Sequence, residues 1–597
     1  MSPIILAPLC LAAALAGEPV PHACPQPWDS ARAAIATIGD EKAVKALEAW
    51  LRLYRAGKIE FLSKQDVGKE SLAAKFGLTA KGRTGDATWA GDLDLILEAL
   101  AKLDTAEAAT AMLEVAAIGI DNGKYTVPMA PYAVREAGER WIGRLKSDEA
   151  KAAIGAFAAG TGKVDRARAV AMRVAAIRMV GALHDRSQRA ALEAALHAEE
   201  ETVRVTAAEA LGALGDIGAA EALVRTLEQD GSDAVLPAAV QALRDLYRDE
   251  QPKPAAKTAG DGATPPAAEP PAILPAGLQA ALRAAIAALG RTTWRADLAL
   301  VKFLGDYPTK AAVAALIGML ERFKAHPEEV QSGKLSGLLR HRVHETLVTM
   351  TGAVFAADEP EKWREMWDRK QDKFVARPGE PAKSASTSAA GFCGVPVQGT
   401  RIVFVLDLSG SMEFPMTGKG TDSRPRKETR LDFAKRELHR AVEAITADAQ
   451  FNLVTFNGNP KAKVWSKDLV PATDRNKERF LKYVDDLRAD GGTNLWSGLE
   501  DGLKIKSLVL GSRYETNVDE VFVLSDGAPS VGDVLDPIEI LRLVHETNRY
   551  AKTRINTVFI SSIDPADRQA PMPWMTITPE DLMKRMAEQN GGKFVNL

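Results

Sequence analysis

The spacing of hydrophobic residues changes character once along the chain, near residue 391. Before that point, apolar residues recur every three or four positions, the spacing that places them on one face of an α-helix. After it, short and nearly continuous apolar runs alternate with helical patterns. The sequence therefore predicts an all-α N-terminal part followed by an α/β C-terminal part.

The helical part contains an internal repeat. Segment 172–185 (MRVAAIRMVGALHD) aligns with 203–216 (VRVTAAEALGALGD) at an offset of 31 residues, and a third copy follows at 235–246. A more divergent copy stands at 134–145. Repeats of this length are typical of stacked helical hairpins, in which each hairpin buries its apolar face on the next.

This pattern resembles HEAT-type repeats. The resemblance is clearest over residues 130–250, inside a helical region expected at 25–250, and a second HEAT-like segment is expected at 275–375. It implies an α-solenoid that acts as a scaffold or binding surface without chemistry of its own. Residues 251–274 and 376–391 are rich in Pro, Ala and small polar residues without apolar periodicity, so both are expected to be flexible linkers.

The C-terminal part alternates apolar strands with amphipathic helices. Strands are expected at 401–409, 449–458, 519–527 and 555–562, with a helix at 431–445 and another that ends before Gly591. Alternation of this kind predicts an open, mostly parallel sheet with helices on both faces, a doubly wound or Rossmann-like fold. In such sheets, ligands bind outside the carboxyl ends of the strands.

Polar side chains gather at these strand ends. Asp407, Ser409 and Ser411 follow the first strand, and Asp526 closes the third. Thr493 comes directly after two glycines, which allow the backbone to approach a ligand closely. Three segments that are remote in sequence would thus deliver two carboxylates and three hydroxyls to one edge of the sheet.

This set resembles the metal-ion-dependent adhesion site of von Willebrand factor A (VWA) domains. The family's Asp-x-Ser-x-Ser motif corresponds to Asp407, Ser409 and Ser411, its threonine to Thr493, and its later aspartate to Asp526. The resemblance covers about residues 398–597. It implies a VWA domain whose metal keeps one coordination position open for an Asp or Glu of a partner protein.

The donor atoms themselves indicate the metal. Carboxylate and hydroxyl oxygens are hard ligands that suit Mg²⁺, with Ca²⁺ or Mn²⁺ as alternatives. Neutral hydroxyls leave much of the positive charge of the cation uncancelled. Two alternatives stay open: that the serines only cap a helix beside a local aspartate turn, and that the metal serves folding alone.

Composition and charge narrow the choice of partners and chemistry. With 76 Lys and Arg against 79 Asp and Glu, the net charge of −3 does not favour a nucleic-acid partner. At 597 residues, the chain is long enough for several domains. It has no His-Glu-x-x-His motif, and His341 and His344 are expected on a helix surface. The sequence therefore predicts a protein that is not an enzyme.

The N-terminus has the pattern of a secretory signal. An apolar stretch at 3–16 ends in Ala-Leu-Ala, so residues 1–16 are expected to be cleaved and the protein to work outside the cytoplasm. No Lys or Arg precedes the stretch, which leaves an uncleaved anchor or a start codon placed too early as alternatives. No later segment is apolar enough to span a membrane. Cleavage would leave Cys24 and Cys393, either unpaired, which is favoured, or bridged.

Taken together, these patterns favour a non-enzymatic, extracytoplasmic binding protein. Its VWA domain would capture an acidic side chain of a partner, and its helical repeats would offer a scaffold and a second binding surface. The loop at 413–430 would lie beside the metal and shape partner choice, or be a solvated loop. The alternatives are a VWA adaptor subunit of a larger enzyme, ATPase or chaperone assembly, which a cytoplasmic N-terminus would favour, and a metal-assisted hydrolase.

Overall fold

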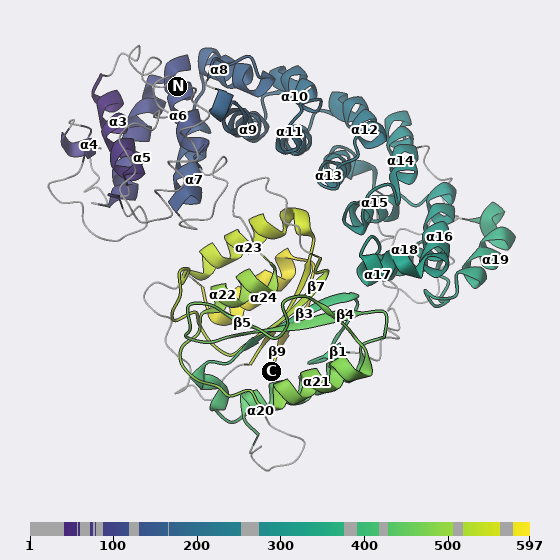
Figure 1. The fold of residues 1–597 in the computed structure, drawn as a ribbon. Coiled ribbons are helices and arrows are strands. Elements are labelled where there is room, and N and C mark those ends of the chain that lie inside the picture. The colour runs from purple at the N-terminus through teal and green to yellow at the C-terminus, as the bar shows by residue number, and fades with distance from the viewer. Residues whose placement is uncertain are drawn as a thin grey trace, which may run out of the picture. The chain divides into compact units, whose positions relative to one another are not determined.

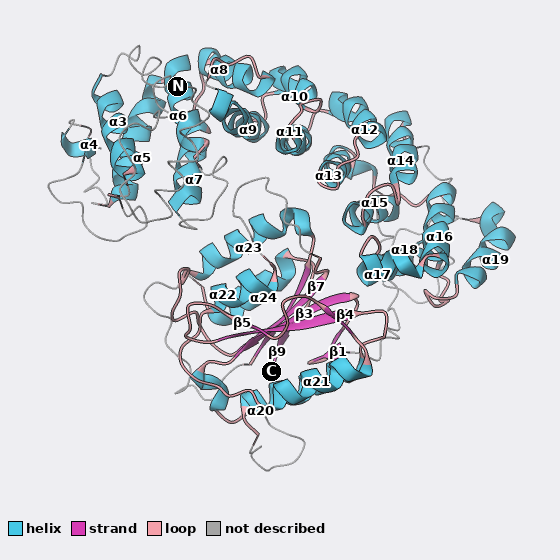
Figure 2. Cartoon of the chain, viewed as in Figure 1, coloured by secondary structure: helices cyan, strands magenta, loops and turns pink. Residues whose placement is uncertain are grey.

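The structure is a computed structural model that describes most of the chain beyond its N-terminal region (Figures 1 and 2). The expected signal segment at 1–16 and nearly all of the expected linkers at 251–274 and 376–391 lie outside the described residues. The described residues are 41–56, 58–59, 72–75, 78, 88–118, 130–164, 166–251, 274–374, 391–416, 428–504, 517–560 and 577–597.

The chain divides into two compact units, the first reaching Ala219 and the second beginning at Ala220. The described part of the first unit is helical (Figure 2). Its helices are α3 (Glu41–Arg55), α4 (Leu72–Lys75), α5 (Trp89–Leu103), α6 (Ala106–Ala116), α7 (Ala130–Ile142), α8 (Asp148–Ala159), α9 (Arg166–Ala182), α10 (Arg189–Ala195) and α11 (Glu201–Leu214).

The second unit begins with further helices that pack mainly on near neighbours in the sequence. Helix α12 packs on α14, α13 on α15, and both α15 and α16 on α18, while α19 packs on α16. This stacking is the arrangement expected of a helical-repeat array. The helices are α12 (Ala220–Gln229), α13 (Val235–Leu246), α14 (Ala276–Ala288), α15 (Trp294–Asp306), α16 (Lys310–Ala325), α17 (Pro327–Ser332), α18 (Gly337–Thr351) and α19 (Pro360–Lys370).

Close packing of two helices in the first unit explains the glycine in the repeated motif. Gly181 of α9 lies against Ala210 of α11, so closely that a Cβ atom added at Gly181 would lie 2.9 Å from the Cα atom of Ala210. Only glycine allows this approach of the two helices. Gly215 then ends α11 in the left-handed conformation, with φ of 66°. The predicted stack of repeated helices is confirmed.

The remainder of the second unit is built on a seven-stranded sheet with the order β5-β4-β3-β7-β8-β9, in which β6 also pairs with β4. Strands β3, β4, β7, β8 and β9 are parallel, whereas β5 and β6 run antiparallel to β4. The strands are β3 (Arg401–Asp407), β4 (Gln450–Phe456), β5 (Lys463–Val464), β6 (Val470–Pro471), β7 (Glu520–Ser525), β8 (Arg554–Phe559) and β9 (Phe594–Asn596).

Helices cover both faces of this sheet (Figure 1). Helices α20 (Arg430–Ala444) and α21 (Asp474–Asp485) lie on one face, and α22 (Leu495–Gly502), α23 (Pro537–Ala551) and α24 (Pro579–Gln589) on the other. Strand side chains alternate between the two faces, as in any sheet. Phe404 and Leu406 join the core formed with α20 and α21, whereas Val405 meets α22. The predicted doubly wound fold is confirmed.

A short hairpin precedes the sheet. Strands β1 (Gly391–Phe392) and β2 (Val395–Pro396) pair antiparallel, and the Phe392 ring packs edge-on against Phe404 and Phe522 of the sheet. The hairpin therefore adds to the core of the α/β domain residues that lie before the expected start at 398.

The last helices of the repeat array are fastened to the sheet within the second unit. Ser336, which caps α18, donates its hydroxyl hydrogen to Asp519 Oδ2 at 2.5 Å, and Gly337 N donates to Thr400 Oγ1 at 3.3 Å. Asp519 is 1% exposed, and burial raises the pKa of its carboxyl. Thr400 and Asp519 directly precede β3 and β7, so this contact lies at the opposite end of the sheet from the predicted polar clusters.

Candidate metal centre

The sheet brings two of the three predicted clusters to the same edge. Strands β3 and β7 are adjacent and parallel, with Leu406 paired to Leu524. Asp407 ends β3 and Asp526 follows the last residue of β7, so both carboxylates emerge at the carboxyl edge. The third cluster reaches this edge through the segment before α22, where Asp490 N donates to Leu408 O at 2.8 Å.

Asp407 is fully buried and is engaged through both carboxylate oxygens. Its Oδ1 atom accepts from Ser409 N at 2.8 Å, and its Oδ2 atom accepts from the Ser525 hydroxyl at 2.6 Å. Burial, and next the negative charge of Asp526, raise the pKa of Asp407 to about 7. The two carboxylates are therefore close enough to repel each other, and a cation between them would relieve that repulsion.

A chain of hydroxyl groups links the β3 loop to the β7 loop. The Ser409 and Ser411 hydroxyl oxygens lie 3.1 Å apart, and the Ser411 hydroxyl donates to Asp526 Oδ1 at 2.8 Å. Four of the five predicted site residues are thus connected by contacts of hydrogen-bond length, because Asp407 is joined to Ser409 through the backbone.

Thr493 is held at the same edge by its backbone. Its N–H donates to the Ser530 hydroxyl, and its carbonyl accepts from Ser530 N, both at 2.9 Å. A Cβ atom added at Gly527 would lie 3.6 Å from Thr493 Oγ1 and 4.0 Å from Ser411 Oγ. Within the described part of the chain, the Thr493 hydroxyl makes no hydrogen bond although the residue is only 6% exposed. The Thr493 hydroxyl oxygen is not one of the buried polar atoms that lack a partner, so it is accessible to solvent and to a ligand at this edge.

Arg430 is a residue of this site that the sequence analysis did not name, although it ends the loop at 413–430 that was expected beside the metal. As the first residue of α20, it places Nη1 at 2.5 Å from Asp526 Oδ2. Nothing in the spacing distinguishes Arg430 from the other basic residues of that loop. The helix start offers the one usable signal, since Thr429 and Asp432 form a capping box around it. Residues 417–427 of the loop lie outside the described residues.

The residues present fit a hard divalent cation. The cluster offers oxygen donors alone, from two carboxylates and three hydroxyls, as Mg²⁺ or Mn²⁺ sites require. Among the described residues, no three His, Cys, Asp or Glu side chains gather as a metal-binding group. A cation would bind the Thr493 hydroxyl, which has no hydrogen-bond partner in the described part of the chain, and would offset the repulsion between Asp407 and Asp526.

Apolar side chains flank the candidate centre. Phe414, three residues after Ser411, is 52% exposed, and Val531, which lies beside Gly492, is 38% exposed. The edge therefore combines buried oxygen donors with a partly apolar rim, a composition common at protein-binding surfaces.

The other residues singled out in the sequence are engaged elsewhere. His341 Nε2 lies 2.6 Å from Gln398 Nε2 and 3.0 Å from Glu345 Oε1, whereas His344 Nε2 lies 2.8 Å from Phe355 O. The two histidines thus have separate partners in a half-buried helix and share no ligand.

The cysteines are also not part of the site. Cys393 is buried and unpaired, and burial raises the pKa of its thiol, while Cys24 lies outside the described residues.

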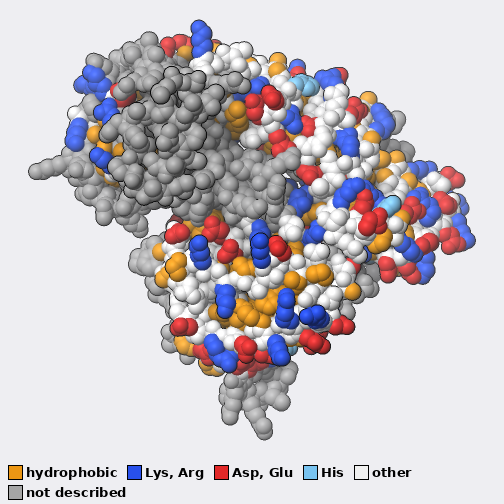
Figure 3. Space-filling view, viewed as in Figure 1, with side chains coloured by type: hydrophobic (Ala, Val, Ile, Leu, Met, Phe, Trp, Pro, Cys, Tyr) orange, Lys and Arg blue, Asp and Glu red, His pale blue; other side chains and the backbone are white. Residues whose placement is uncertain are grey.

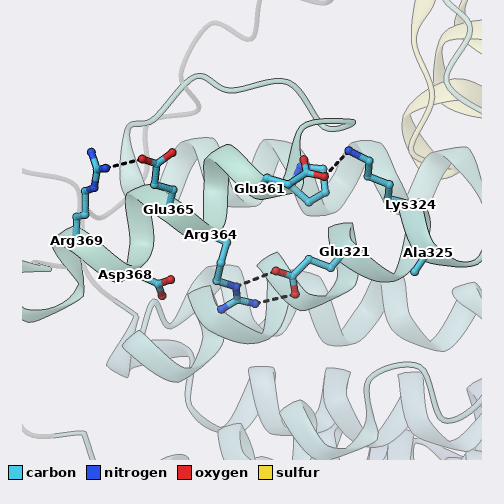
Figure 4. A pocket seen from close by; sticks show the side chains of 9 residues that line it. Glu321, Lys324, Ala325, Glu361, Arg364, Glu365, Asp368 and Arg369 are labelled. Atoms are coloured by element: carbon cyan, nitrogen blue, oxygen red, sulfur yellow. Dashed lines mark hydrogen bonds and ion pairs between the residues drawn. The ribbon is translucent and has the colours of Figure 1, made fainter.

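A cavity of about 610 Å³ lies between α16 and α19, away from the sheet (Figure 4). Arg364 forms a two-pronged pair with Glu321, at 2.8 and 2.9 Å, and Lys324 pairs with Glu361. Arg369 pairs with Glu365 at 2.5 Å. Because each of these bases is matched by an acid, the walls of the cavity point to no charged ligand.

The surface shows charges of both signs. On the face drawn in Figure 3, blue and red side chains are interspersed, and neither forms a continuous field over the described residues. This agrees with the net charge of −3, and the absence of a nucleic-acid partner stays a prediction. Within the described ranges, none of the helices has the length and apolarity needed to cross a bilayer.

Two family profiles match the chain. The von Willebrand factor type A domain matches residues 402–588, and HEAT repeats match residues 163–244. The first range contains every predicted metal-site residue, the parallel strands β4, β7 and β8, and all of β3 except Arg401. The second contains α9 to α12 and most of α13, where the sequence repeat was clearest.

Among curated proteins, the chain is similar to heavy chains of inter-alpha-trypsin inhibitor. It is 29% identical over 143 residues to heavy chain 4 of Mus musculus, which is 23% of this chain and 13% of that protein. It is 31% identical over 145 residues to heavy chain H3 of Bos taurus, 24% of this chain and 14% of that protein. The match therefore spans about one seventh of the length of these relatives.

Among solved structures, the chain is similar to a von Willebrand factor type A protein from Catenulispora acidiphila, with 17% identity, a TM-score of 0.23, and coverage of 33% of this chain and 38% of that one. It is also similar to the PilB minor pilin from Streptococcus sanguinis, with 17% identity, a TM-score of 0.21, and coverage of 34% and 58%. Each likeness covers about a third of this chain.

Proposed function

We propose that this chain, which contains a von Willebrand factor type A domain at 402–588 and HEAT repeats at 163–244, is a non-enzymatic protein-binding protein that works outside the cytoplasm. Asp407, Ser409, Ser411, Thr493 and Asp526 would hold a divalent cation, Mg²⁺ in the first place. When bound, the cation supplies an open coordination position that an Asp or Glu of a partner protein can occupy.

One observation carries the proposal. Oxygen donors from the β3 loop, the β7 loop and the segment before α22 converge at the carboxyl edge of the sheet, and the Thr493 hydroxyl there has no hydrogen-bond partner among the described residues. With three neutral hydroxyls in the set, a dication would keep an excess of positive charge. That excess is the physical reason for it to attract an external carboxylate.

The surroundings of the serines support a binding role over catalysis. The Ser409 and Ser411 hydroxyls hydrogen-bond to each other, and that of Ser411 donates to Asp526. No histidine in the described ranges hydrogen-bonds to either hydroxyl. A serine nucleophile needs a general base within hydrogen-bond reach. The HEAT repeats would act as a scaffold and offer a second surface to another partner.

The proposal is tested by partner capture with and without EDTA. Wild-type protein is expected to retain a partner in Mg²⁺ and release it in EDTA, and Asp407→Ala is expected to retain none in either buffer. Asp468→Ala, which removes an exposed carboxylate elsewhere in the same domain, should behave as wild type. A second partner that wild type and Asp407→Ala hold equally, with and without EDTA, would bind elsewhere, for example to the helical repeats. If no captured partner depends on both Mg²⁺ and Asp407, the metal-dependent function is refuted.

The location outside the cytoplasm is tested separately at the N-terminus. Cell fractionation followed by N-terminal sequencing should recover a mature chain that begins after residue 16. Recovery of the intact N-terminus in the cytosolic fraction would contradict the location and favour an adaptor role.

A further inference from the structure

Arg430 makes a buried ion pair with one of the candidate metal ligands. Its Nη1 atom lies 2.5 Å from Asp526 Oδ2, its side chain is 6% exposed, and that of Asp526 is fully buried. The same nitrogen approaches Ser411 O at 3.4 Å. The guanidinium thus contacts a carboxylate of the β7 loop and the backbone of the β3 loop, without access to a partner protein.

The position of Arg430 is fixed by its surroundings. Its backbone N–H donates to Phe414 O at 2.9 Å, and it opens α20 directly after the Thr429 cap. The guanidinium carbon lies 5.6 Å from the centroid of the Phe414 ring. The guanidinium of Arg430 contacts a ring, a carboxylate and a carbonyl, and these contacts restrict its side chain to one conformation.

The two carboxylates of the site are held differently. Both oxygens of Asp526 are engaged, Oδ1 by the Ser411 hydroxyl and Oδ2 by the positive charge of Arg430. Among the described residues, Asp407 accepts from two neutral donors, Ser409 N and the Ser525 hydroxyl. Arg430 therefore offsets one of two buried negative charges, and a dication would meet a site of net charge −1 and not −2.

We propose that Arg430 sets the strength of metal binding at this centre. It holds and neutralises Asp526, so the site binds a divalent cation more weakly than two free carboxylates would, and the bound cation keeps more positive charge for the carboxylate of a partner. Arg430 is in this sense a positioning residue that acts through Asp526 and is not a metal ligand. The inference rests on the proposed metal-binding function and extends it.

The first test measures the affinity of the full chain for Mn²⁺ and for Mg²⁺, each as the metal alone, by titration calorimetry. Arg430→Met is expected to bind each metal roughly tenfold more tightly than wild type, because a repelling charge near the cation is gone. Arg430→Lys keeps the charge and should bind close to wild type. The control Arg436→Met removes a half-exposed arginine of the same helix and should change nothing. Unchanged or weaker binding by Arg430→Met would overturn the inference.

The second test reads stability without metal. In EDTA, Arg430→Met should unfold several degrees below wild type, because Asp526 and Asp407 are left to repel each other without a counter-charge. Asp526→Asn in the Arg430→Met background should recover part of that loss. Should Arg430→Met not fold, Arg430→Gln, which removes the charge but can still donate a hydrogen bond to Asp526, replaces it in the titrations. Mn²⁺ binding by Arg430→Gln equal to that of wild type would then refute the role of Arg430.

The same titrations separate this inference from the proposed function. If neither wild type nor Asp407→Ala binds Mn²⁺, the metal-binding function itself fails, and the role of Arg430 fails with it. If wild type binds Mn²⁺, Asp407→Ala does not, and Arg430→Met equals wild type, the metal centre stands and only the role of Arg430 is refuted.

Discussion

At the scale of single residues, the candidate metal centre is built from hydroxyls more than from charges. Ser409, Ser411 and Thr493 contribute neutral oxygens, and the two carboxylates, Asp407 and Asp526, sit within reach of each other. Thr493 is the most informative of the five, because its hydroxyl makes no hydrogen bond within the described part of the chain. A methyl group in place of that hydroxyl should therefore leave the metal-free fold unchanged.

Replacing Thr493 by valine therefore isolates the ligand role. The side-chain shape is kept, so the metal-free protein should unfold within about 0.5 kcal/mol of wild type in EDTA. Affinity for Mg²⁺ should fall by roughly tenfold or more, because one donor is lost. Thermal denaturation in EDTA and titration calorimetry give the two readouts.

A matched control for that change is Thr557→Val. The Thr557 hydroxyl is buried and donates to Met583 O at 2.8 Å, so its loss should destabilise the fold by about 1–3 kcal/mol and leave metal affinity unchanged. Equal Mg²⁺ affinity for wild type and Thr493→Val would remove Thr493 from the site.

A buried acid in the helical part predicts a pH effect. Asp297 of α15 is 1% exposed, its Oδ1 atom accepts from Gly290 N at 2.8 Å, and burial raises the pKa of its carboxyl from 3.8 to about 6. Between those values the folded chain binds a proton that the unfolded chain does not. Asp297 therefore adds stability as the pH falls from about 6 to about 4.

Asp297→Asn removes this dependence while keeping the side-chain shape. At pH 7.5 the free energy of unfolding of the variant should exceed that of wild type, because the buried carboxylate of wild type is then charged. Between pH 4.5 and pH 7.5 this difference between the two proteins should grow by up to about 3 kcal/mol for a shift of this size. Urea denaturation of both proteins at the two pH values gives the difference. If that difference does not vary with pH, the carboxyl of Asp297 does not titrate in this window.

At the scale of elements, the spacing of apolar residues predicted the long strands and the repeated helices. The apolar runs at 401–409 and 519–527 became the buried strands β3 and β7, and the repeated motif became α9, α11 and α13. The two-residue strands β5 and β6 are too short to show a period of two, so their pairing with β4 had no signal.

The sequence pattern also gave no indication of the contacts between elements that are remote in the chain. Ser525 is a site residue because β7 lies beside β3, where its hydroxyl donates to Asp407. The fastening of α18 to the sheet was also missed, since it depends on one buried carboxylate, Asp519, and on the cap Ser336. Such pairings are decided by tertiary packing and leave no local pattern.

The contact of α18 with the sheet predicts coupled unfolding of these two parts. Asp519 accepts from the Ser336 hydroxyl, from Thr400 N and from Arg401 N, so Asp519→Ala leaves these buried donors unpaired. We expect a loss of several kcal/mol, at about 1–3 kcal/mol for each such donor, and a calorimetric transition that broadens or splits.

A milder variant and a control refine that measurement. Ser336→Ala should cost about 1–3 kcal/mol through the lost bond to Asp519 and the lost cap of α18. Ser147→Ala removes the cap of α8 in the first unit and should leave the unfolding of the α/β domain unchanged. A single sharp transition at the wild-type temperature for Asp519→Ala would show that this contact does not couple the two parts.

At the scale of the whole molecule, the helical array and the candidate metal centre meet the sheet at opposite ends of its strands. Within the second unit, the helical array is fastened at the amino ends of β3 and β7, and the oxygen cluster lies at their carboxyl ends. A partner that reaches the metal edge therefore does not compete with α18. Under the proposed function, one partner would bind the helical repeats and another the metal edge, and EDTA would release only the second.

The central claim is that five oxygen-bearing side chains hold one divalent cation that keeps a free coordination position. A crystal structure of the protein grown with Mn²⁺, with anomalous scattering used to locate the metal, tests it most directly. The account predicts one anomalous peak about 2.0–2.3 Å from the hydroxyl oxygens of Ser409, Ser411 and Thr493, with a water or an external carboxylate in a remaining position. A peak elsewhere, or Thr493 and Asp526 turned away from the two serines around it, would contradict the account.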